Sequence, residues 1–397
     1  MKVLQINCVY GKGSTGRIVR DLHNEYIKNG VDSIVVYGRG NAPENGDANV
    51  IRQGSELFSK LRSGLSRIDG DIYGKAFFNT RRIEKIIEKE RPDIVHLHCI
   101  NGNFCNVFAL VGRLKSNKIK TVLTQHAEFF YTGNCGYAFD CEGYKTGCRN
   151  CPDQYAAIGS RKKGAAERNF QKMKSAFDGF EDGLRPTGVS DWITGRSNGS
   201  AILGGYKCVT VMNGTDTDTF RYFPSEKAES GKNVIFVTPY FEDENKGGQW
   251  LLKLAKRFEG EDVRFTVVGD HNREYDAPNV VFTGRINDPK KLALAYSGSD
   301  ACVLTSRRES FSMVCAESLC CGTPIAGFKA GAPEMISLKD YSSFVEYGDI
   351  DALENALREL LDNNFDKAEI SEKAKSVYSK KAMADGYIRI YKELIGG

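Results

Sequence analysis

The alternation of short apolar runs with charged amphipathic segments predicts repeated strand–helix units. In the first part of the chain, apolar runs at 2–7, 33–37, 94–98 and 121–124 predict strands, and the segments 16–29 and 81–90 predict helices. Apolar runs of this length between turn residues are typical of buried strands in parallel sheets. The pattern therefore predicts an α/β domain with a doubly wound sheet.

A second series of the same kind begins near residue 234. Its expected strands are 234–238, 264–268, 280–282, 301–304 and 324–326, and its expected helices are 247–258, 289–297 and 313–321. The segments 189–194 and 208–212 are expected to complete the first sheet, and one long charged helix, about 371–394, ends the chain. We expect two Rossmann-like domains that face a central cleft, because ligands bind at the carboxyl ends of parallel strands. The expected boundaries are 1–220 for the first domain, 221–375 for the second, and 376–397 for a helix that returns to the first.

Composition narrows the class of protein. The 397 residues carry 55 basic and 51 acidic side chains, a balance that does not indicate a general nucleic-acid binder. No run approaches the roughly 18 apolar residues needed to cross a bilayer. The N-terminal sequence MKVLQINCVYGKGSTG lacks the apolar core of a signal peptide. We expect a cytoplasmic protein.

A pair of glutamates carries the candidate chemistry. Glu309 follows an expected strand, and Glu317 lies eight positions later on an expected helix. Ser310 and Ser312 are N-cap candidates for that helix, whose free N–H groups and dipole suit a phosphate. A carboxylate can accept two hydrogen bonds from a vicinal diol of a ribose or hexose. The arrangement suits a nucleotide-sugar.

The segment SRRESFSMVCAESLCCGTPIAGF resembles the glutamate–seven residues–glutamate signature of retaining GT-B glycosyltransferases, family four. The segments PDIVHLH, NGTDTDTF and GAPE are similar to further motifs of that family, and the resemblance covers nearly the whole chain. The resemblance implies that Glu309 contacts the transferred sugar and Glu317 the ribose. It also implies that donor contacts come from the helix start, at Ser310, Phe311 and Ser312.

The loop DENKGG supplies a candidate phosphate ligand, Lys246, whose compact positive charge lies between flexible residues. In the family this lysine binds the donor pyrophosphate. Many members also carry an arginine after the preceding strand, where this chain has Thr238-Pro239-Tyr240. Arg285 and Arg308 are the candidates to replace it.

The glycine loop GKGSTG near the N-terminus is expected to place Gly13 and Gly16 near the donor phosphate. It lacks the Gly-Lys-Ser/Thr ending of a P-loop. The strand after it ends Tyr37-Gly38-Arg39, without the acid that a nicotinamide site uses.

Three histidines lie on or directly after expected strands of the first domain. His96 and His98 alternate along one strand and should share a side of the sheet. The resemblance places His126 near the donor sugar, with Ala127 where the family usually has aspartate. Glu128 is a candidate replacement, although it points the other way in an extended chain. His98 is expected in the core.

Twelve cysteines divide into two groups. Eight are scattered and expected to be buried apolar residues. The other four lie within the segment 127–186, which resembles an insertion, and their thiolates could close a tetrahedral zinc site: Cys135, Cys141, Cys148 and Cys151. No open position is evident, so we expect a structural zinc. An iron–sulfur cluster is less favoured, and a nucleic-acid-binding zinc ribbon has only Arg161-Lys162-Lys163 in its support.

Together these features predict a retaining hexosyltransferase that uses a nucleotide-diphosphate sugar and needs no catalytic metal. The expected acceptor is a saccharide or lipid-linked saccharide of surface polysaccharide synthesis, with peripheral contact at the inner face of the membrane. A helical apolar stripe either belongs to the core, which is favoured, or touches lipid: Ala166, Phe170, Met173 and Phe177. The alternatives are a GT-B nucleotide-sugar epimerase and a non-catalytic zinc-bearing binding protein.

Overall fold

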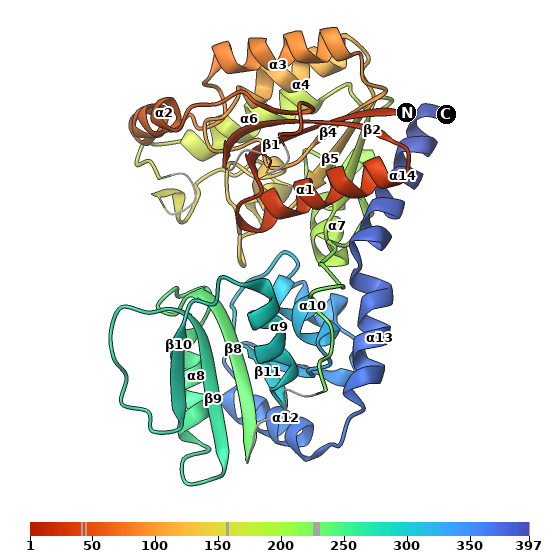
Figure 1. Ribbon diagram of the computed structural model, residues 1–397. Coiled ribbons are helices and arrows are strands. Elements are labelled where there is room, and N and C mark those ends of the chain that lie inside the picture. The colour runs from red at the N-terminus through yellow and green to blue at the C-terminus, as the bar shows by residue number, and fades with distance from the viewer. Residues whose placement is uncertain (41–42, 44–45, 156–158, 225–230, 397) are drawn as a thin grey trace. The chain divides into compact units, whose positions relative to one another are not determined.

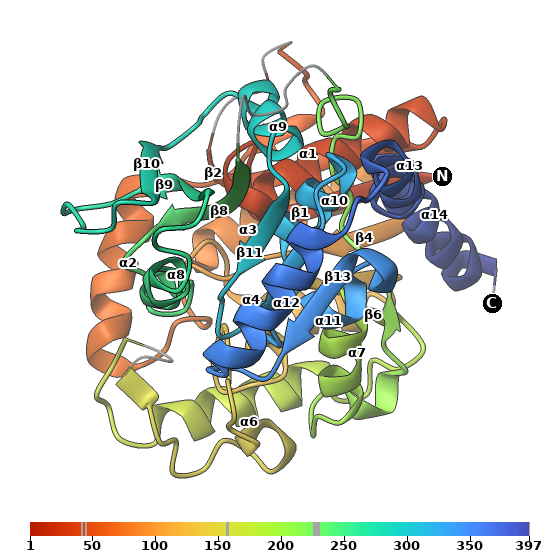
Figure 2. The same ribbon diagram turned by 90° about the horizontal axis from the view of Figure 1, so that it is seen from below.

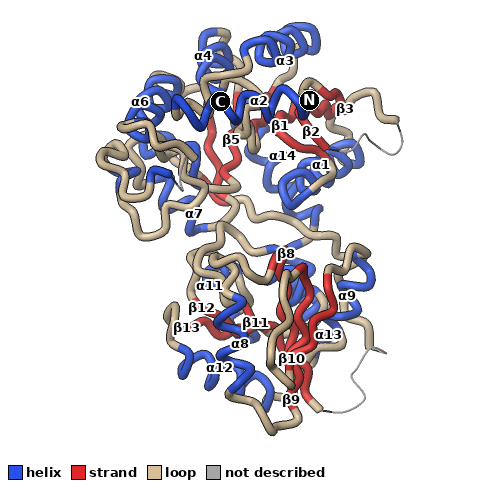
Figure 3. The backbone as a smooth tube through the Cα atoms, turned by 90° about the vertical axis from the view of Figure 1, so that its left-hand side faces the viewer, coloured by secondary structure: helices blue, strands red, loops and turns tan. Residues whose placement is uncertain are grey.

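The computed structural model describes residues 1–40, 43, 46–155, 159–224 and 231–396. The chain forms two compact units, one of Met1–Met212 with Met383–Gly397 and the other of Asn213–Ala382. Each unit is built on one parallel sheet, as the sequence predicts, and Figure 3 shows the strands of the two sheets in red. No described helix is long and apolar enough to cross a membrane.

The sheet of the first unit has seven strands in the order β3-β2-β1-β4-β5-β6-β7. They are β1 (Lys2–Tyr10), β2 (Asp32–Gly40), β3 (Val50–Arg52), β4 (Ile94–Leu97), β5 (Thr121–Gln125), β6 (Leu184–Gly188) and β7 (Val209–Thr210). Every pairing is parallel. The order reverses between β1 and β4, and loops at the carboxyl ends of such strands form the ligand sites of doubly wound sheets.

Helices cover both faces of this sheet (Figure 1). The helices α3 (Phe77–Glu90), α4 (Val107–Ser116) and α6 (Ala165–Phe177) share a core with Leu4 and Ile6 of β1. The helix α1 (Gly13–Lys28) and the C-terminal part of α14 (Lys380–Gly396) pack with Val3 on the opposite face. Side chains alternate across a strand, which explains why neighbouring residues of β1 belong to different cores. The smaller elements are α2 (Glu56–Asp69), α7 (Asp191–Asn198), η1 (Glu128–Phe130), η2 (Gly143–Lys145) and η3 (Gly204–Tyr206).

The second unit has six parallel strands in the order β10-β9-β8-β11-β12-β13. They are β8 (Lys232–Tyr240), β9 (Val263–Asp270), β10 (Val280–Gly284), β11 (Ala301–Leu304), β12 (Ile325–Phe328) and β13 (Ser342–Val345). Leucines of α8 (Gly248–Lys256) and α12 (Ile350–Asp362) cover one face, and Figure 2 shows these two helices on the same side. The remaining helices are α9 (Pro289–Ser297), α10 (Met313–Cys320), α11 (Pro333–Ile336), η4 (Lys339–Tyr341) and α13 (Lys367–Tyr378). Here the order reverses between β8 and β11.

The C-terminal residues Met383–Gly397 belong to the first unit, but the C-terminal helix is not continuous. The predicted single helix is wrong, because α13 ends at Tyr378 and the extended residue Ser379 separates it from α14. The Ser379 hydroxyl accepts a hydrogen bond from the Ala382 N–H (3.1 Å), which caps the new helix. From Met383 onward, α14 buries Tyr387 and Tyr391 in the first unit.

One prediction about the middle of the chain needs correction. The strand expected at 189–194 is wrong: the strand is β6, and α7 follows because Ser190 accepts a hydrogen bond from the Ile193 N–H (3.3 Å). The aromatic side chains of the segment 127–186 pack in the main core of the first unit. The stripe in α6 is buried, so it belongs to the core and offers no surface to lipid: Ala166, Phe170, Met173 and Phe177.

Candidate functional site

Two loops of the second unit are joined by hydrogen bonds at the carboxyl ends of β8 and β11. The Arg307 N–H donates to the Asn245 carbonyl (2.8 Å), and the Asn245 side chain donates to the Arg308 carbonyl (3.0 Å). The Thr305 hydroxyl donates to the Gly247 carbonyl (2.8 Å). These contacts hold the loop that carries Lys246 against the loop after β11.

The joined loops bring the first two predicted site residues together. The Lys246 ammonium donates to the Glu309 carboxylate at 2.6 Å, and the glutamate is only 7% exposed. A charged hydrogen bond in such a setting is stronger than one in water because the surroundings screen it less. Lys246 and Glu309 therefore form one charged group at the edge where β8 and β11 end.

A third motif meets this pair. The Glu309 N–H donates to the Ala330 carbonyl (2.9 Å), and Glu309 forms an isolated bridge to Gly331. The Glu334 carboxylate accepts hydrogen bonds from the N–H groups of Ala330 and Gly331 (3.0 Å each). The GAPE loop is thus held by its own glutamate and fixes the backbone of Glu309.

Ser312, the N-cap residue of α10, lies three residues beyond Glu309. Ser312 has a φ of 82°, an unusual value for serine, and its hydroxyl accepts from the Cys315 N–H (3.3 Å). Such strained residues concentrate at functional sites. Phe311 is buried, with its ring 6.5 Å from that of Tyr378, so its side chain serves packing and only its backbone can reach a ligand. Ser310 and Glu317 are also buried, the latter on α10 itself.

Arg285 reaches the end of β8. Its guanidinium donates to the Pro239 carbonyl (3.0 Å) and pairs with Asp270 (2.5 Å), while half of the side chain remains exposed. Pro239 belongs to the triplet that stands where the family usually has arginine. The structure therefore places the guanidinium of Arg285, the residue after β10, beside that triplet.

The first unit contains a chain of hydrogen-bonded side chains that begins at His126. His98 and His96 are fully buried with ring centroids 3.9 Å apart, which confirms that they share one side of the sheet. His126, half-buried after β5, places Nε2 3.1 Å from His98 Nδ1. His98 Nε2 lies 3.2 Å from Gln5 Oε1, and Tyr391 of α14 bonds to His96 Nδ1 (2.5 Å).

The series of hydrogen-bonded side chains continues from Gln5 to the surface. Gln5 Nε2 donates to the Ser33 hydroxyl (3.5 Å), Ser33 Oγ lies 2.8 Å from His23 Nδ1, and His23 Nε2 lies 2.9 Å from Asp47. A carboxylate can only accept a hydrogen bond, so His23 donates to Asp47 through Nε2.

The same reasoning assigns the tautomers of the inner histidines. Gln5 uses its amide to donate, so its oxygen accepts from His98 Nε2–H, and His98 Nδ1 then accepts from His126 Nε2–H. His126 is left with Nδ1 as an acceptor. Burial lowers the pKa of His126 to about 4 and the pKa of His98 well below its usual value, so both rings are neutral at pH 7.

Other predicted residues have separate positions. Gly13 and Gly16 lie in the first turn of α1, directly after β1, and a side chain at Gly16 would come within 3.3 Å of the Gly11 nitrogen. Glu128 is fully buried and accepts hydrogen bonds from Arg196 (2.6 Å) and the Ala138 N–H (2.7 Å). Glu128 is therefore engaged in the fold and does not replace the missing aspartate.

The four clustered cysteines line one small cavity of about 20 Å³. The Gly133 N–H donates to Cys148 Sγ (3.2 Å) and the Gly143 N–H to Cys141 Sγ (3.4 Å). Among the residues that the structure describes, no three metal-ligating side chains stand close enough to hold an ion. The zinc site remains a prediction. The eight scattered cysteines are all buried, as expected.

Sequence reasoning missed the residues that hold the site together, chiefly Asn245, Thr305, Gln5 and Asp47. Gln5 had a signal, because it is a polar residue inside the apolar run KVLQIN. A larger cavity of about 480 Å³ lies at the amino ends of β8 and β9, beside Lys232 and Val263. That edge is opposite to Lys246, so we assign the cavity no role.

Gly247 tests the joining of the loops. It has a φ of 73°, and a Cβ there would lie 2.3 Å from the Thr305 carbonyl oxygen. Gly247→Ala should lower the free energy of unfolding by more than about 2 kcal/mol, measured by denaturant titration. The matched control is Gly260→Ala, with a similar φ of 85° in open space, which should cost only about 1 kcal/mol. Equal losses in the two variants would contradict the close approach of the loops.

The pKa of His126 tests the hydrogen-bonded chain. NMR titration of the imidazole should give a pKa of about 4, with the resonance assigned by its loss in His126→Gln. Because the folded-state pKa lies below the unfolded value of about 6.5, this histidine's stabilising contribution is complete above that pH. It is lost as the pH falls towards 4. A pKa near that of free histidine would show that the ring is not held as described.

The chain is similar to known glycosyltransferases. Residues 15–165 match the family model described as Glycosyltransferase Family 4, and residues 231–363 match the model described as Glycosyl transferases group 1. A putative colanic acid biosynthesis glycosyl transferase of Escherichia coli K12 is 24% identical over 418 residues, covering 99% of this chain and 100% of that protein. An uncharacterized 41.2 kDa protein in the cps region of Klebsiella pneumoniae is 25% identical, covering 93% of this chain and 98% of its own.

The fold also matches solved structures. The crystal structure of Anabaena HepE in complex with UDP-glucose superposes with a TM-score of 0.66 at 12% identity, covering 99% of this chain and 100% of that one. The two family models fall on the two parallel-sheet units, one on each. The chain thus belongs to the glycosyltransferases with the GT-B fold.

Proposed function

We propose that this glycosyltransferase moves a hexose from a nucleotide-diphosphate sugar, with retention at the anomeric carbon, to a saccharide or lipid-linked saccharide acceptor. The observation that carries the proposal is the Lys246–Glu309 pair beside the start of α10. It sets a cation, a carboxylate and the N-terminus of a helix at one edge of the sheet. A role in surface polysaccharide synthesis is supported by the names of the colanic acid and cps-region relatives.

Donor binding would break the ion pair between Lys246 and Glu309. Lys246 and the N–H groups near Ser312 would take the diphosphate, and Arg285 would add a second cation from the end of β8. Glu309, released from Lys246, could then accept hydrogen bonds from hydroxyls of the transferred sugar. Glu317 is proposed to hold the ribose. The positive charge for the leaving group would come from these side chains, so we expect no requirement for a divalent cation.

In the proposed reaction the acceptor oxygen bonds to the anomeric carbon on the face that the diphosphate leaves. The bond from that carbon to the phosphate oxygen breaks, and the acceptor's proton passes to the departing phosphate. On the first unit, we propose that His126 offers its Nδ1 lone pair to a hydroxyl of the sugar. Gly13 and Gly16 are proposed to let the backbone before α1 approach the donor phosphate.

Two substitutions separate binding from chemistry. Lys246→Ala should weaken binding of the nucleoside diphosphate about tenfold or more, because one phosphate cation is lost. Glu309→Gln should leave that affinity within about threefold and lower kcat by roughly 10² to 10³. Calorimetry with UDP, GDP and ADP would measure affinity, and product NMR would give the anomeric configuration.

The control for Lys246→Ala is Lys256→Ala, an exposed lysine of α8 that should change neither quantity. Unchanged diphosphate affinity in Lys246→Ala would contradict the assigned phosphate site. Interconversion of two nucleotide-sugars without acceptor would favour the epimerase instead.

We also propose a structural zinc at Cys135, Cys141, Cys148 and Cys151. Their thiols share one cavity, two of the sulfurs accept backbone N–H hydrogen bonds, and four thiolates form a donor set that zinc prefers. A bound ion would draw the four sulfurs together and cross-link the segment 135–151. It would take no part in the reaction.

Elemental analysis of the purified protein should find about one zinc per chain. Cys148→Ser should lose the metal and lower the melting temperature, whereas Cys105→Ser, a buried cysteine outside the cluster, should keep it. Metal-free protein with an unchanged melting temperature after zinc addition would refute the site.

A further inference from the structure

The helix α2 has its apolar side chains outside and its serines inside. Ser59 and Ser66 are 5% and 2% exposed, whereas five large apolar residues of the same helix are 56–74% exposed: Leu57, Phe58, Leu61, Leu65 and Ile68. Their spacing places all five within one face, because residues three, four and seven apart lie on the same side of a helix. A soluble protein rarely leaves such a continuous apolar face in water without a function.

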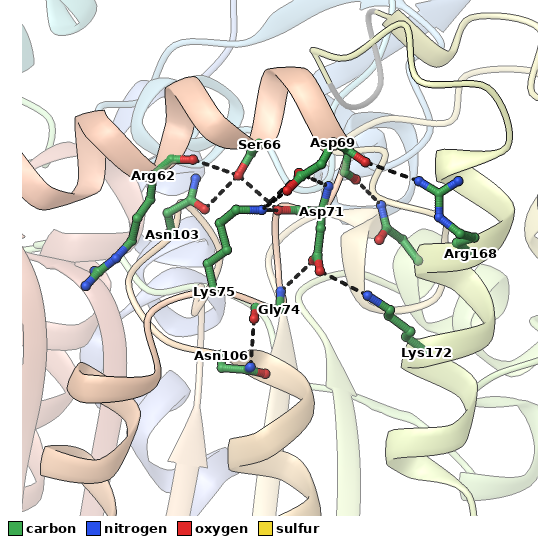
Figure 4. Close-up of polar contacts among 12 residues, drawn as sticks. Arg62, Ser66, Asp69, Asp71, Gly74, Lys75, Asn103, Asn106, Arg168 and Lys172 are labelled. Atoms are coloured by element: carbon green, nitrogen blue, oxygen red, sulfur yellow. Dashed lines mark hydrogen bonds and ion pairs between the residues drawn. The ribbon is translucent and has the colours of Figure 1, made fainter.

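This orientation is set by contacts on the inner side of α2 (Figure 4). Ser66 Oγ lies 3.0 Å from Asn103 Oδ1 and 2.9 Å from the Asp71 carbonyl oxygen. Arg168 of α6 donates to the Asp69 carbonyl (3.1 Å), and Asn169 donates to the Gly70 carbonyl (2.7 Å). Rotating α2 to bury its leucines would break all of these hydrogen bonds, so the outward apolar face belongs to the folded state.

Two further exposed apolar residues follow α2 along the chain. Phe77 and Phe78, at the start of α3, are 66% and 82% exposed. The connection between α2 and α3 is short, and Lys75 within it donates to the Asp69 carboxylate (2.8 Å) and the Asp71 carbonyl (2.7 Å). Figure 1 and Figure 2 both show α2 at the periphery of the first unit.

Basic side chains border this face. Helical spacing puts Lys60 and Arg67, both exposed, along one side of the five apolar residues. Arg168 bonds to both the Asp69 and the Lys163 carbonyls (3.1 Å each), which joins the end of α2 to an exposed basic run, Arg161-Lys162-Lys163. The guanidinium carbon of Arg161 lies over the ring of the exposed Tyr155, 5.2 Å from the centroid of that ring.

We propose that this α2 surface docks the protein on an anionic lipid bilayer. The surface consists of Leu57, Phe58, Leu61, Leu65 and Ile68 with the bordering cations Lys60, Arg67, Arg161, Lys162 and Lys163. Apolar side chains that project from a helix enter the boundary between headgroups and acyl chains, and flanking cations contact lipid phosphates. Tyrosine beside such a surface suits the same boundary, with its ring apolar and its hydroxyl polar.

The cations that border the α2 surface indicate which kind of partner it binds. A second copy of this chain would bring the same cations against themselves, and like charges repel. A purely apolar partner would leave the cations without counter-charges. An anionic bilayer satisfies both the apolar face and its border. The inference does not depend on the proposed donor chemistry, which uses residues of other elements.

Flotation with vesicles of phosphatidylcholine containing one-third phosphatidylglycerol tests the proposal. The full chain should float with these vesicles and much less with phosphatidylcholine alone. Leu61→Ser with Leu65→Ser should weaken binding about tenfold or more, because two inserted side chains are removed. Lys60→Gln with Arg67→Gln should weaken binding to anionic vesicles about fivefold for each charge.

Matched controls are exposed residues elsewhere. Val281→Ser with Met335→Ser removes exposed apolar side chains of the second unit, and Lys290→Gln with Lys291→Gln removes exposed charges. Both should bind vesicles as the unaltered protein does. All the altered positions are on the surface, so melting temperatures should agree within a few degrees.

Two results would overturn the inference. One is vesicle binding of the leucine variant equal to that of the unaltered protein. The other is the absence of vesicle binding by the unaltered protein together with a concentration-dependent dimer that the leucine variant abolishes, which would make the surface a contact between copies of the chain.

Discussion

The nearly buried carboxylate of Glu309 imposes the main constraint on the second unit. A charged group in such a place is costly unless a cation and hydrogen bonds compensate it, and Lys246 supplies the cation at 2.6 Å. The lysine can reach only because Asn245 and Thr305 join its loop to the one after β11. Gly247 permits that approach, since any side chain there would meet the Thr305 carbonyl. The diphosphate site we propose thus depends on a contact between two loops rather than on any single residue.

The first unit solves a different problem, the burial of His23, His96 and His98. Each ring needs partners in the core, and the chain from His126 through His98 and Gln5 provides them without introducing a net charge. This hydrogen-bonded series ends at Asp47, a carboxylate at the edge of the unit, which accepts from His23 Nε2–H. His96 is held from the other side by Tyr391, so the returning C-terminal helix also supports this arrangement. One consequence is a neutral His126 with a defined acceptor nitrogen.

The α2 surface shows that apolar residues and core residues are not the same set. The stripe of α6 has helical spacing and basic neighbours, and it is fully buried. The helix α2 has a comparable stripe and the opposite orientation, because its Ser66 finds hydrogen-bond partners in the fold. The identity of the inner contacts, and not the pattern of the outer residues, decides which stripe faces outward.

The sequence by itself determined the fold class and the residues on which the proposed chemistry depends. Short apolar runs alternating with amphipathic segments allow few arrangements other than parallel α/β units, and the glutamate pair and the DENKGG loop are local patterns. The boundaries of helices and strands were harder to predict from the sequence. The break at Ser379 and the start of α7 at Ser190 each depend on the hydrogen bond of one hydroxyl group.

Only the tertiary structure decided which residues meet. Lys246 and Glu309 are 63 positions apart, and His98 and Gln5 are 93 apart. Local periodicity holds no information about such pairings, because they arise from the order of strands in a sheet and the loops that the order brings together. The same is true of α2, whose outward apolar face follows from hydrogen bonds to Asn103 and to residues of α6.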